Sequence, residues 1–185
     1  MLLKRLGAFF LDILQVVVFA VSIFLFIYLL IMQPHKIKGS SMEPDFHDGE
    51  FLLTDKVTYR FGKPKRDDVI VFKAPPDDSD EFIKRIIGVP NDTINIQSGK
   101  VYLNGNVINE PYLAQNTYTS SGTFAKENVP FTIPNDFYFV MGDNREHSFD
   151  SRNFGLINKS KITGRAWVIY WPVSKLGVIK NPLDK

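Results

Sequence analysis

Ser41 lies in the short segment Gly39-Ser40-Ser41-Met42-Glu43-Pro44. Glycine, serine and proline favour tight turns, so this segment predicts a turn that exposes a hydroxyl group on constrained backbone. A serine hydroxyl becomes a nucleophile for acyl transfer when a neighbouring base takes its proton. Ordinary turn propensity also accounts for the segment. A role for Ser41 as a nucleophile therefore depends on whether a base lies near it.

Lys84 is the first candidate base, and it lies in EFIKRIIG (81–88), which is typical of a strand. Side chains alternate along a strand, so Phe82, Lys84 and Ile86 share one face. Burial among apolar neighbours disfavours the ammonium form and lowers the lysine pKa. Lowering this pKa from ~10.4 to ~7.5 corresponds to about 4 kcal/mol, which requires a largely desolvated site. The plain alternative is an edge-strand lysine whose amine reaches solvent.

Histidine is the other candidate base, and the chain has His35, His47 and His147. They show no spacing typical of metal ligands. His147 lies close to Asp150 in a polar loop, and triads assemble from residues far apart in sequence. A Ser41–His147–Asp150 triad is therefore an alternative to a Ser/Lys pair.

That polar loop, GDNREHSFDSR (142–152), is dense in charged and hydrogen-bonding groups. It predicts either a solvated loop or an ion-pair scaffold in which Asp143 and Asp150 hold arginines. The arginines available to them are Arg85, Arg145 and Arg152. Ser148, in the same loop, could hydrogen-bond a neutral lysine and orient its lone pair.

An apolar run precedes the Ser41 turn, from Ile13 to Met32, and only Gln15 and Ser22 in it are clearly polar. Twenty residues at a rise of about 1.5 Å span about 30 Å, the hydrocarbon thickness of a bilayer. The residues that follow lack a cleavage site of the A-x-A kind, so we expect an uncleaved anchor at 1–33, with the span at about 13–32. Basic residues flank both ends of the run, so charge does not decide its orientation.

The remainder, residues 34–185, is expected to form one mainly β domain of ordinary size. Runs rich in Val, Ile, Phe and Tyr predict strands at 50–55, 68–73, 81–88, 92–97, 100–105, 137–142 and 165–172. Ser98-Gly99 and Asn104-Gly105 predict two-residue hairpin turns, and no long helical period follows residue 40. A net charge of +2 gives no indication of a nucleic-acid partner, and the absence of cysteine excludes disulfides and thiolate zinc sites.

Taken together and in this order, four segments resemble bacterial type I signal peptidases: GSSMEP, DDVIVF, EFIKRIIGVPND and MGDNREHSFDSRNFG. The resemblance covers nearly the whole chain. It implies a Ser/Lys dyad in which Ser41 is the nucleophile, Lys84 is the general base and Ser148 orients the lysine amine. It implies no metal and no cofactor. The expected reaction is removal of signal peptides from exported preproteins.

The resemblance also implies a setting for this chemistry. The fold would be a β-rich catalytic core with a small second β-subdomain and one N-terminal transmembrane helix. The protein would lie in the cell membrane as a single-pass protein, with its catalytic domain on the extracytoplasmic side, in contact with signal peptides and membrane lipid. The residues that match the family's structural charges are Asp143, Arg145, Asp150 and Arg152, with Arg85 as a partner.

Some positions depart from the family pattern. Gly39 stands where some members have a serine that helps to hold the oxyanion, so the expected donors are the Ser41 N–H and a neighbour such as Ser40. Asp45 stands where threonine is common. The expected walls of the substrate pocket are Ile37, Met42 and Ile83, which lie beside the proposed catalytic residues in sequence.

Two other functions remain open from the sequence. Self-cleaving repressor-type peptidases use related Ser/Lys chemistry, although the apolar run and the lack of a DNA-binding segment argue against them. The second alternative is a non-catalytic membrane-anchored β-domain that binds a partner, with Ser41 and Lys84 as ordinary surface residues.

Overall fold

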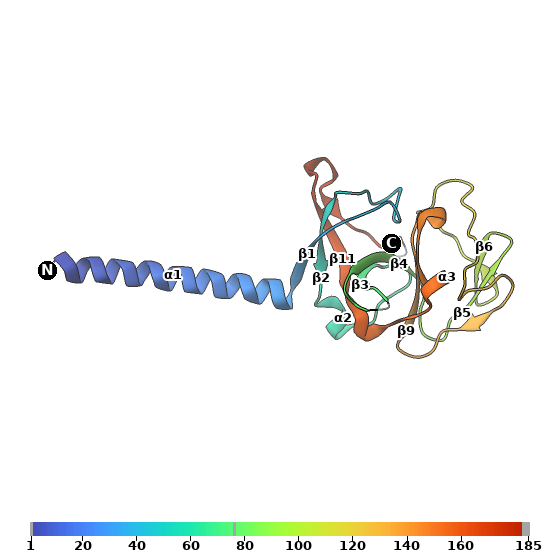
Figure 1. Cartoon of the computed structure of the whole chain (residues 1–185), viewed down its shortest axis with the longest axis horizontal. Coiled ribbons are helices and arrows are strands. Elements are labelled where there is room, and N and C mark those ends of the chain that lie inside the picture. Colours follow the sequence, from blue (N-terminus) through green and yellow to red (C-terminus); the bar gives the residue numbers. More distant parts are fainter. Residues whose placement is uncertain (1, 76, 183–185) are drawn as a thin grey trace.

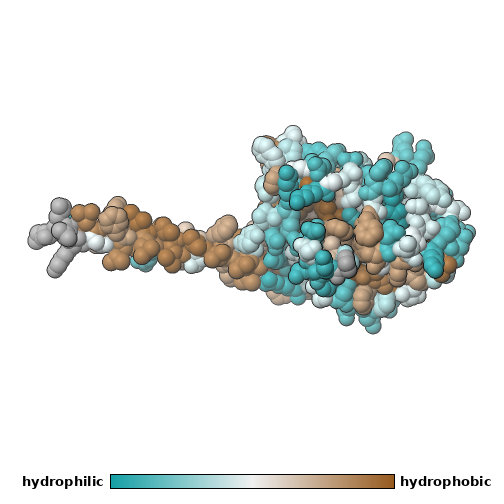
Figure 2. Space-filling view, in the orientation of Figure 1, coloured by the Kyte–Doolittle hydropathy of each residue, from teal (hydrophilic) through white to brown (hydrophobic). Residues whose placement is uncertain are grey.

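The computed structural model describes residues 2–75 and 77–182. Its longest element is the helix α1 (Leu2–Leu30). This helix projects from a β-rich domain, and apolar side chains cover most of its surface (Figures 1 and 2). Its segment Arg5–Leu30 is long and apolar enough to cross a membrane. The helix extends on the N-terminal side of the span expected at about 13–32, and Asp12 lies within it. It also ends earlier, because Met32 already belongs to a strand.

The larger sheet has eight strands in the order β1-β2-β11-β3-β4-β9-β10, with β12 paired to β11, and every pair of strands is antiparallel. The strands are β1 (Met32–Lys36), β2 (Phe51–Asp55), β3 (Val69–Lys73), β4 (Glu81–Gly88), β9 (Phe137–Met141), β10 (Ile157–Asn158), β11 (Ile162–Trp171) and β12 (Gly177–Val178). The predicted strands in these regions are confirmed, with ends that differ by a few residues.

A second, four-stranded sheet in the order β7-β6-β5-β8 forms a small subdomain at the end of the molecule away from α1 (Figure 1). Its strands are β5 (Thr93–Gln97), β6 (Lys100–Leu103), β7 (Asn106–Val107) and β8 (Phe131–Thr132). Both predicted hairpin turns are confirmed. Ser98 and Gly99 have φ of 50° and 75°, and Asn104 and Gly105 have φ of 52° and 84°. Two successive positive φ angles are the requirement of a type I′ turn.

Past residue 40, the described chain contains only short helices, as the sequence predicts. They are α2 (Thr58–Phe61), η1 (Arg145–His147), α3 (Ser151–Phe154), η2 (Lys159–Lys161) and η3 (Val173–Lys175). The strand β4 is central to the packing, because Ile86 and Ile87 belong to different core clusters on its two faces. A side chain on β4 is therefore held in a fixed place by core on both sides.

Candidate active site

The Ser41 turn is held on a closed loop that begins where β1 ends. The Ile37 N–H donates to the Glu50 carbonyl at 2.8 Å, and the Gly49 N–H donates to the Ile37 carbonyl at 3.0 Å. Within the loop, Met42 and Phe46 are buried in the core cluster that also contains Ile37. Ser41 follows this anchored backbone directly, so its hydroxyl is presented from a rigid turn.

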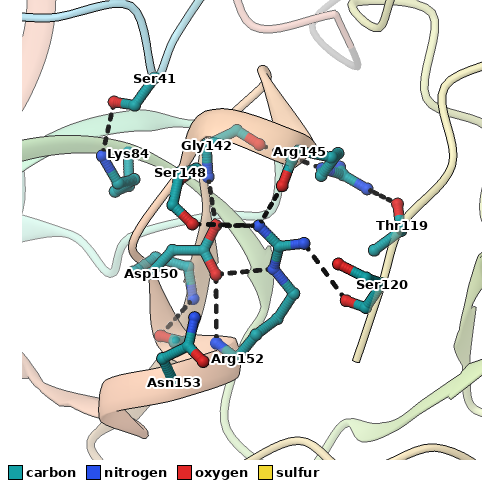
Figure 3. A network of polar contacts seen from close by, with 12 residues as sticks. Ser41, Lys84, Thr119, Ser120, Gly142, Arg145, Ser148, Asp150, Arg152 and Asn153 are labelled. Atoms are coloured by element: carbon teal, nitrogen blue, oxygen red, sulfur yellow. Dashed lines mark hydrogen bonds and ion pairs between the residues drawn. The ribbon is translucent and has the colours of Figure 1, made fainter. Parts of the chain in front are cut away.

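Lys84 reaches this hydroxyl from the centre of β4. Its Nζ lies 2.7 Å from Ser41 Oγ and 3.1 Å from the carbonyl oxygen of Ile83 (Figure 3). Only 4% of Lys84 is exposed, and its Nζ lies 5.4 Å from the centre of the Phe82 ring. Burial lowers the pKa of Lys84 from 10.5 to about 8, against a smaller opposing attraction from Asp150. The arrangement joins a hydroxyl to an amine that is readily neutral.

Ser148 lies in the loop that faces this pair (Figure 3). Its Oγ is buried and has no hydrogen-bond partner among the described residues, so the hydrogen bond expected between Ser148 and Lys84 is not formed. The approach is close nevertheless: a Cβ built on Gly142 would lie 2.3 Å from Ser148 Oγ and 2.4 Å from the Ser41 carbonyl oxygen. Only glycine at position 142 allows the polar loop to pack this tightly against the Ser41 turn.

Asn144 is a site residue for which the sequence analysis proposed no role. Its backbone N–H donates to the Ser41 carbonyl at 3.0 Å, and its side-chain amide donates to the Ser40 carbonyl at 3.2 Å. These two bonds fix the peptide groups on either side of the Ser41 Cα, the first of which contains the Ser41 nitrogen. The available signal was the density of polar residues around Asn144, which indicated a scaffold without indicating its target.

Arg85, the neighbour of Lys84 on β4, points to the opposite side of the strand and forms a buried ion pair. Its guanidinium donates to both Asp143 carboxylate oxygens, at 2.9 and 2.6 Å. It also contacts Asp45 at 3.3 Å and lies 4.0 Å from the centre of the Tyr112 ring. The expected pairing of Arg85 with Asp143 is therefore present. It connects β4, the polar loop and the Ser41 turn through one cation.

A second buried ion pair joins Arg152 and Asp150, with Nε to Oδ1 at 2.8 Å and Nη2 to Oδ2 at 2.9 Å. Asp150 also accepts a hydrogen bond from the Gly142 N–H at 3.1 Å. Arg145 does not pair with either aspartate of the loop. It binds the carboxylate of Glu110 and donates to Thr119 Oγ1 at 2.7 Å. The polar loop is thus an ion-pair scaffold, and the solvated-loop alternative is wrong.

The histidines do not approach Ser41 as a triad would require. His147 is exposed and its Nδ1 lies 3.2 Å from Asn144 Oδ1, while the Asp150 carboxylate is occupied by Arg152. His35 bonds Glu81 at 2.7 Å. In residues 2–75 and 77–182, no group of three or more His, Asp or Glu side chains could hold a metal ion.

A cleft of about 620 Å³ leads away from Ser41 and Lys84. Ile37 and Ile83 line it, as expected for pocket walls. Met42 does not line it, because its side chain is 1% exposed and packs in the core beneath the turn. His35 of β1 and Glu81 of β4 also line the cleft and bond each other across it. An extended peptide could lie between these two walls with its carbonyl near Ser41.

Comparison with known proteins identifies the family of this chain. The family described as signal peptidase, peptidase S26, matches residues 10–171. Signal peptidase I of Bacillus licheniformis is 35% identical over 170 residues, which cover 88% of this chain and 89% of that protein. Signal peptidase IB of Staphylococcus aureus is 37% identical over 163 residues, which cover 82% and 84%. A solved signal peptidase I from Enterococcus faecalis is 30% identical, with a TM-score of 0.47 over 56% of this chain and 97% of that chain.

The family model and the two relatives extend over most of the chain, and the residues matched by the family model, 10–171, include the site described above. The chain therefore belongs to the peptidase S26 family of signal peptidases, which are serine endopeptidases.

Proposed function

We propose that this protein removes N-terminal signal peptides from exported preproteins by means of a Ser41/Lys84 dyad. The observation that carries the proposal is the 2.7 Å contact between Lys84 Nζ and Ser41 Oγ, made by an amine that is almost fully buried. Neutral Lys84 takes the proton of Ser41 as the hydroxyl attacks the scissile carbonyl. The resulting ammonium then gives this proton to the leaving amine, which leaves an acyl group on Ser41 for hydrolysis by water.

The oxyanion is proposed to bind the Ser41 N–H, assisted by Ser40. Within the described part of the chain the Ser41 N–H has no acceptor of its own, so it is available to a developing negative charge. Asn144 holds the carbonyls of Ser40 and Ser41 and so supports the orientation of this N–H. Loss of one oxyanion donor typically lowers the rate by ~10²–10³.

Ser148 is proposed to orient the Lys84 amine. Its buried and unpartnered Oγ supports this role, because a buried hydroxyl without a hydrogen bond is rare. Lys84 Nζ has three donor positions as an ammonium and two of them have acceptors in the structure, Ser41 Oγ and the Ile83 carbonyl. In this proposal Ser148 Oγ accepts the remaining N–H of Lys84. We expect Ser148→Ala to lower kcat/KM while the Ser41–Lys84 pair stays in place.

Helix α1 is proposed to anchor the protein in the cell membrane, with residues 34–185 on the extracytoplasmic side. The length and apolar surface of α1 support anchoring, and the family resemblance supports the orientation. The chain contains no cysteine, so a cysteine introduced at exposed Val107 is a unique label. A membrane-impermeant thiol reagent should label it in intact spheroplasts. Labelling only after lysis would place the domain in the cytoplasm.

The catalytic proposal is tested with the purified full-length protein in detergent and a preprotein substrate. Ser41→Ala should abolish cleavage, while its thermal unfolding should match that of the parent. His147→Ala is the control and should retain most activity, because the His147 side chain is exposed and lies outside the dyad. Cleavage by Ser41→Ala at the parental rate would show that another group is the nucleophile, whereas no cleavage by the parent protein would favour the alternative of a β-domain that only binds a partner.

A further inference from the structure

A basic segment lies next to the end of α1 and takes no part in the catalytic proposal. Residues 56–66, KVTYRFGKPKR, contain five lysines and arginines and no acidic residue. We call this segment the basic turn. It includes α2 and lies on the side of the β-domain from which α1 projects (Figure 1).

Hydrogen bonds fix the basic turn to the domain end of α1. The Lys56 N–H donates to the Ile31 carbonyl at 2.9 Å, and Lys56 Nζ donates to Gln33 Oε1 at 3.2 Å. In the sheet, Met32 pairs directly with Asp55. The basic turn therefore starts level with the last apolar residues of the helix. In a bilayer crossed by α1, this level is the boundary between hydrocarbon and headgroups.

The conformation of the basic turn holds one aromatic ring outward. Tyr59 is anchored inward, with its hydroxyl donating to Asp68 Oδ2 at 2.8 Å, and Pro64 is buried. Between these anchors, Phe61 is 89% exposed, the largest exposure among the large apolar side chains of the described chain. An aromatic ring held in water by a fixed backbone, beside a membrane helix, matches the position of an interfacial anchor.

Two cations flank this ring. Arg60 and Lys63 are exposed, and neither forms an ion pair within the described residues. Two carboxylates that flank the segment in sequence bond to it: Asp55 accepts from the Val57 and Thr58 N–H groups, and Asp68 accepts from Tyr59. The basic turn therefore presents positive charge to solvent next to the apolar ring of Phe61.

We propose that the basic turn docks onto anionic phospholipid headgroups, with Arg60 and Lys63 binding headgroup phosphates and Phe61 entering the boundary of the hydrocarbon. The inference rests on the proposed anchoring by α1, but it holds for either orientation of that helix. Each basic side chain near an anionic bilayer strengthens binding about fivefold. Loss of both should weaken docking about 25-fold. The basic turn would be a second contact with the membrane besides α1, and it would limit rotation of the domain about the end of that helix.

The test uses the full-length chain in lipid nanodiscs, with Phe61→Cys carrying an environment-sensitive fluorophore as the only thiol label. In discs that contain phosphatidylglycerol we expect blue-shifted emission and quenching by lipids that carry a spin label near the headgroup. In pure phosphatidylcholine both effects should be much weaker. Val107→Cys, in β7 of the distal sheet, is the control label and should report water in both discs.

Charge reversal then tests the role of the two cations. Arg60→Glu with Lys63→Glu, in the labelled chain, should abolish the difference between the two lipids. The control pair Lys100→Glu with Lys126→Glu makes the same change of charge on exposed residues elsewhere and should preserve the difference. Both charge variants should keep parental activity on a short peptide in detergent, which verifies their folding.

The outcomes separate this inference from the catalytic proposal, because no lipid readout depends on cleavage. Ser41→Ala should dock like the parent. A label at position 61 that reports water in both discs overturns the docking proposal. Equal burial in both lipids overturns the role of the anionic headgroups, and so does a charge reversal without effect.

Discussion

The pH dependence of kcat/KM follows directly from the burial of Lys84. Its pKa is lowered from 10.5 to about 8 by burial, and the amine must be neutral in the free enzyme to act as a base. At pH 7 about one tenth of the molecules then carry neutral Lys84, against about one in three thousand for an unperturbed lysine. We therefore expect kcat/KM to rise about tenfold from pH 6 to 7 and to level off above a midpoint near 8.

A charge placed in the cleft should move this midpoint. Phe149 lines the same cleft as Lys84 and is 58% exposed, so a polar side chain can replace it without entering the core. In Phe149→Asp the new carboxylate attracts the Lys84 ammonium, and for an assumed separation of about 8 Å and an effective dielectric constant of about 20 this attraction is about 2 kcal/mol. Solvent around position 149 reduces this attraction, so we expect the midpoint to rise by about 0.5 to 1 unit.

The matched control is Phe149→Asn, which has the same size without the charge. Initial rates at low substrate concentration, from pH 6 to about 10 and with a peptide that does not titrate in this range, give the three midpoints. If kcat/KM of the parent protein does not fall toward acidic pH, Lys84 does not act as the proposed base. Equal midpoints for the Asp and Asn variants would show that the limb belongs to another group.

Other predictions concern the groups around the dyad. Lys84→Arg should be inactive because guanidinium stays protonated, which a cleavage assay checks. Lys84→Met should raise the free energy of unfolding by up to about 3 kcal/mol at pH 7. The lowered pKa of Lys84 destabilises the fold fully below pH 8 and not at all above 10.5, so denaturant titrations at pH 7 and 10.5 should show the gain vanish. Glu110→Gln should cost about 3–5 kcal/mol, because it leaves the buried Arg145 charge unpaired, and calorimetry measures the loss. Asn144→Ala should lower kcat more than KM changes, since its bonds fix the Ser40 and Ser41 carbonyls, and steady-state kinetics separate the two constants.

The strands and hairpins were predictable because their signals are local. Asn104-Gly105 specifies its turn through the backbone of two adjacent residues, and β4 is apparent from a run of branched and aromatic residues. The desolvation of Lys84 was also predictable, since alternation alone placed it beside Phe82 and Ile86. The distance from Lys84 to Ser41 was not, because 43 residues separate them and only the resemblance joined them.

The features of the site that the sequence did not predict depend on contacts between segments far apart in the chain. Glu110, the partner of Arg145, lies 35 residues away in the irregular segment between β7 and β8. Met42 faces the core because the loop after β1 folds back through Ile37 and Glu50, which no local pattern encodes. The role of Asn144 depends on the same closure, since it donates to carbonyls about a hundred residues earlier.

The connection between α1 and the Ser41 turn bears on where a substrate is cut. All five residues of β1 pair with β2, from Met32 with Asp55 to Lys36 with Phe51. The sheet therefore fixes the conformation of this connection. The next hydrogen bond, from the Ile37 N–H to Glu50, continues the same constraint up to the turn. In the proposed arrangement the scissile carbonyl must therefore meet Ser41 at a fixed height above the bilayer. That height is no more than about 30 Å from Met32, given an extended rise of about 3.3 Å per residue. A flexible tether of equal length would reach the same substrates but would not select one bond by its distance from the membrane.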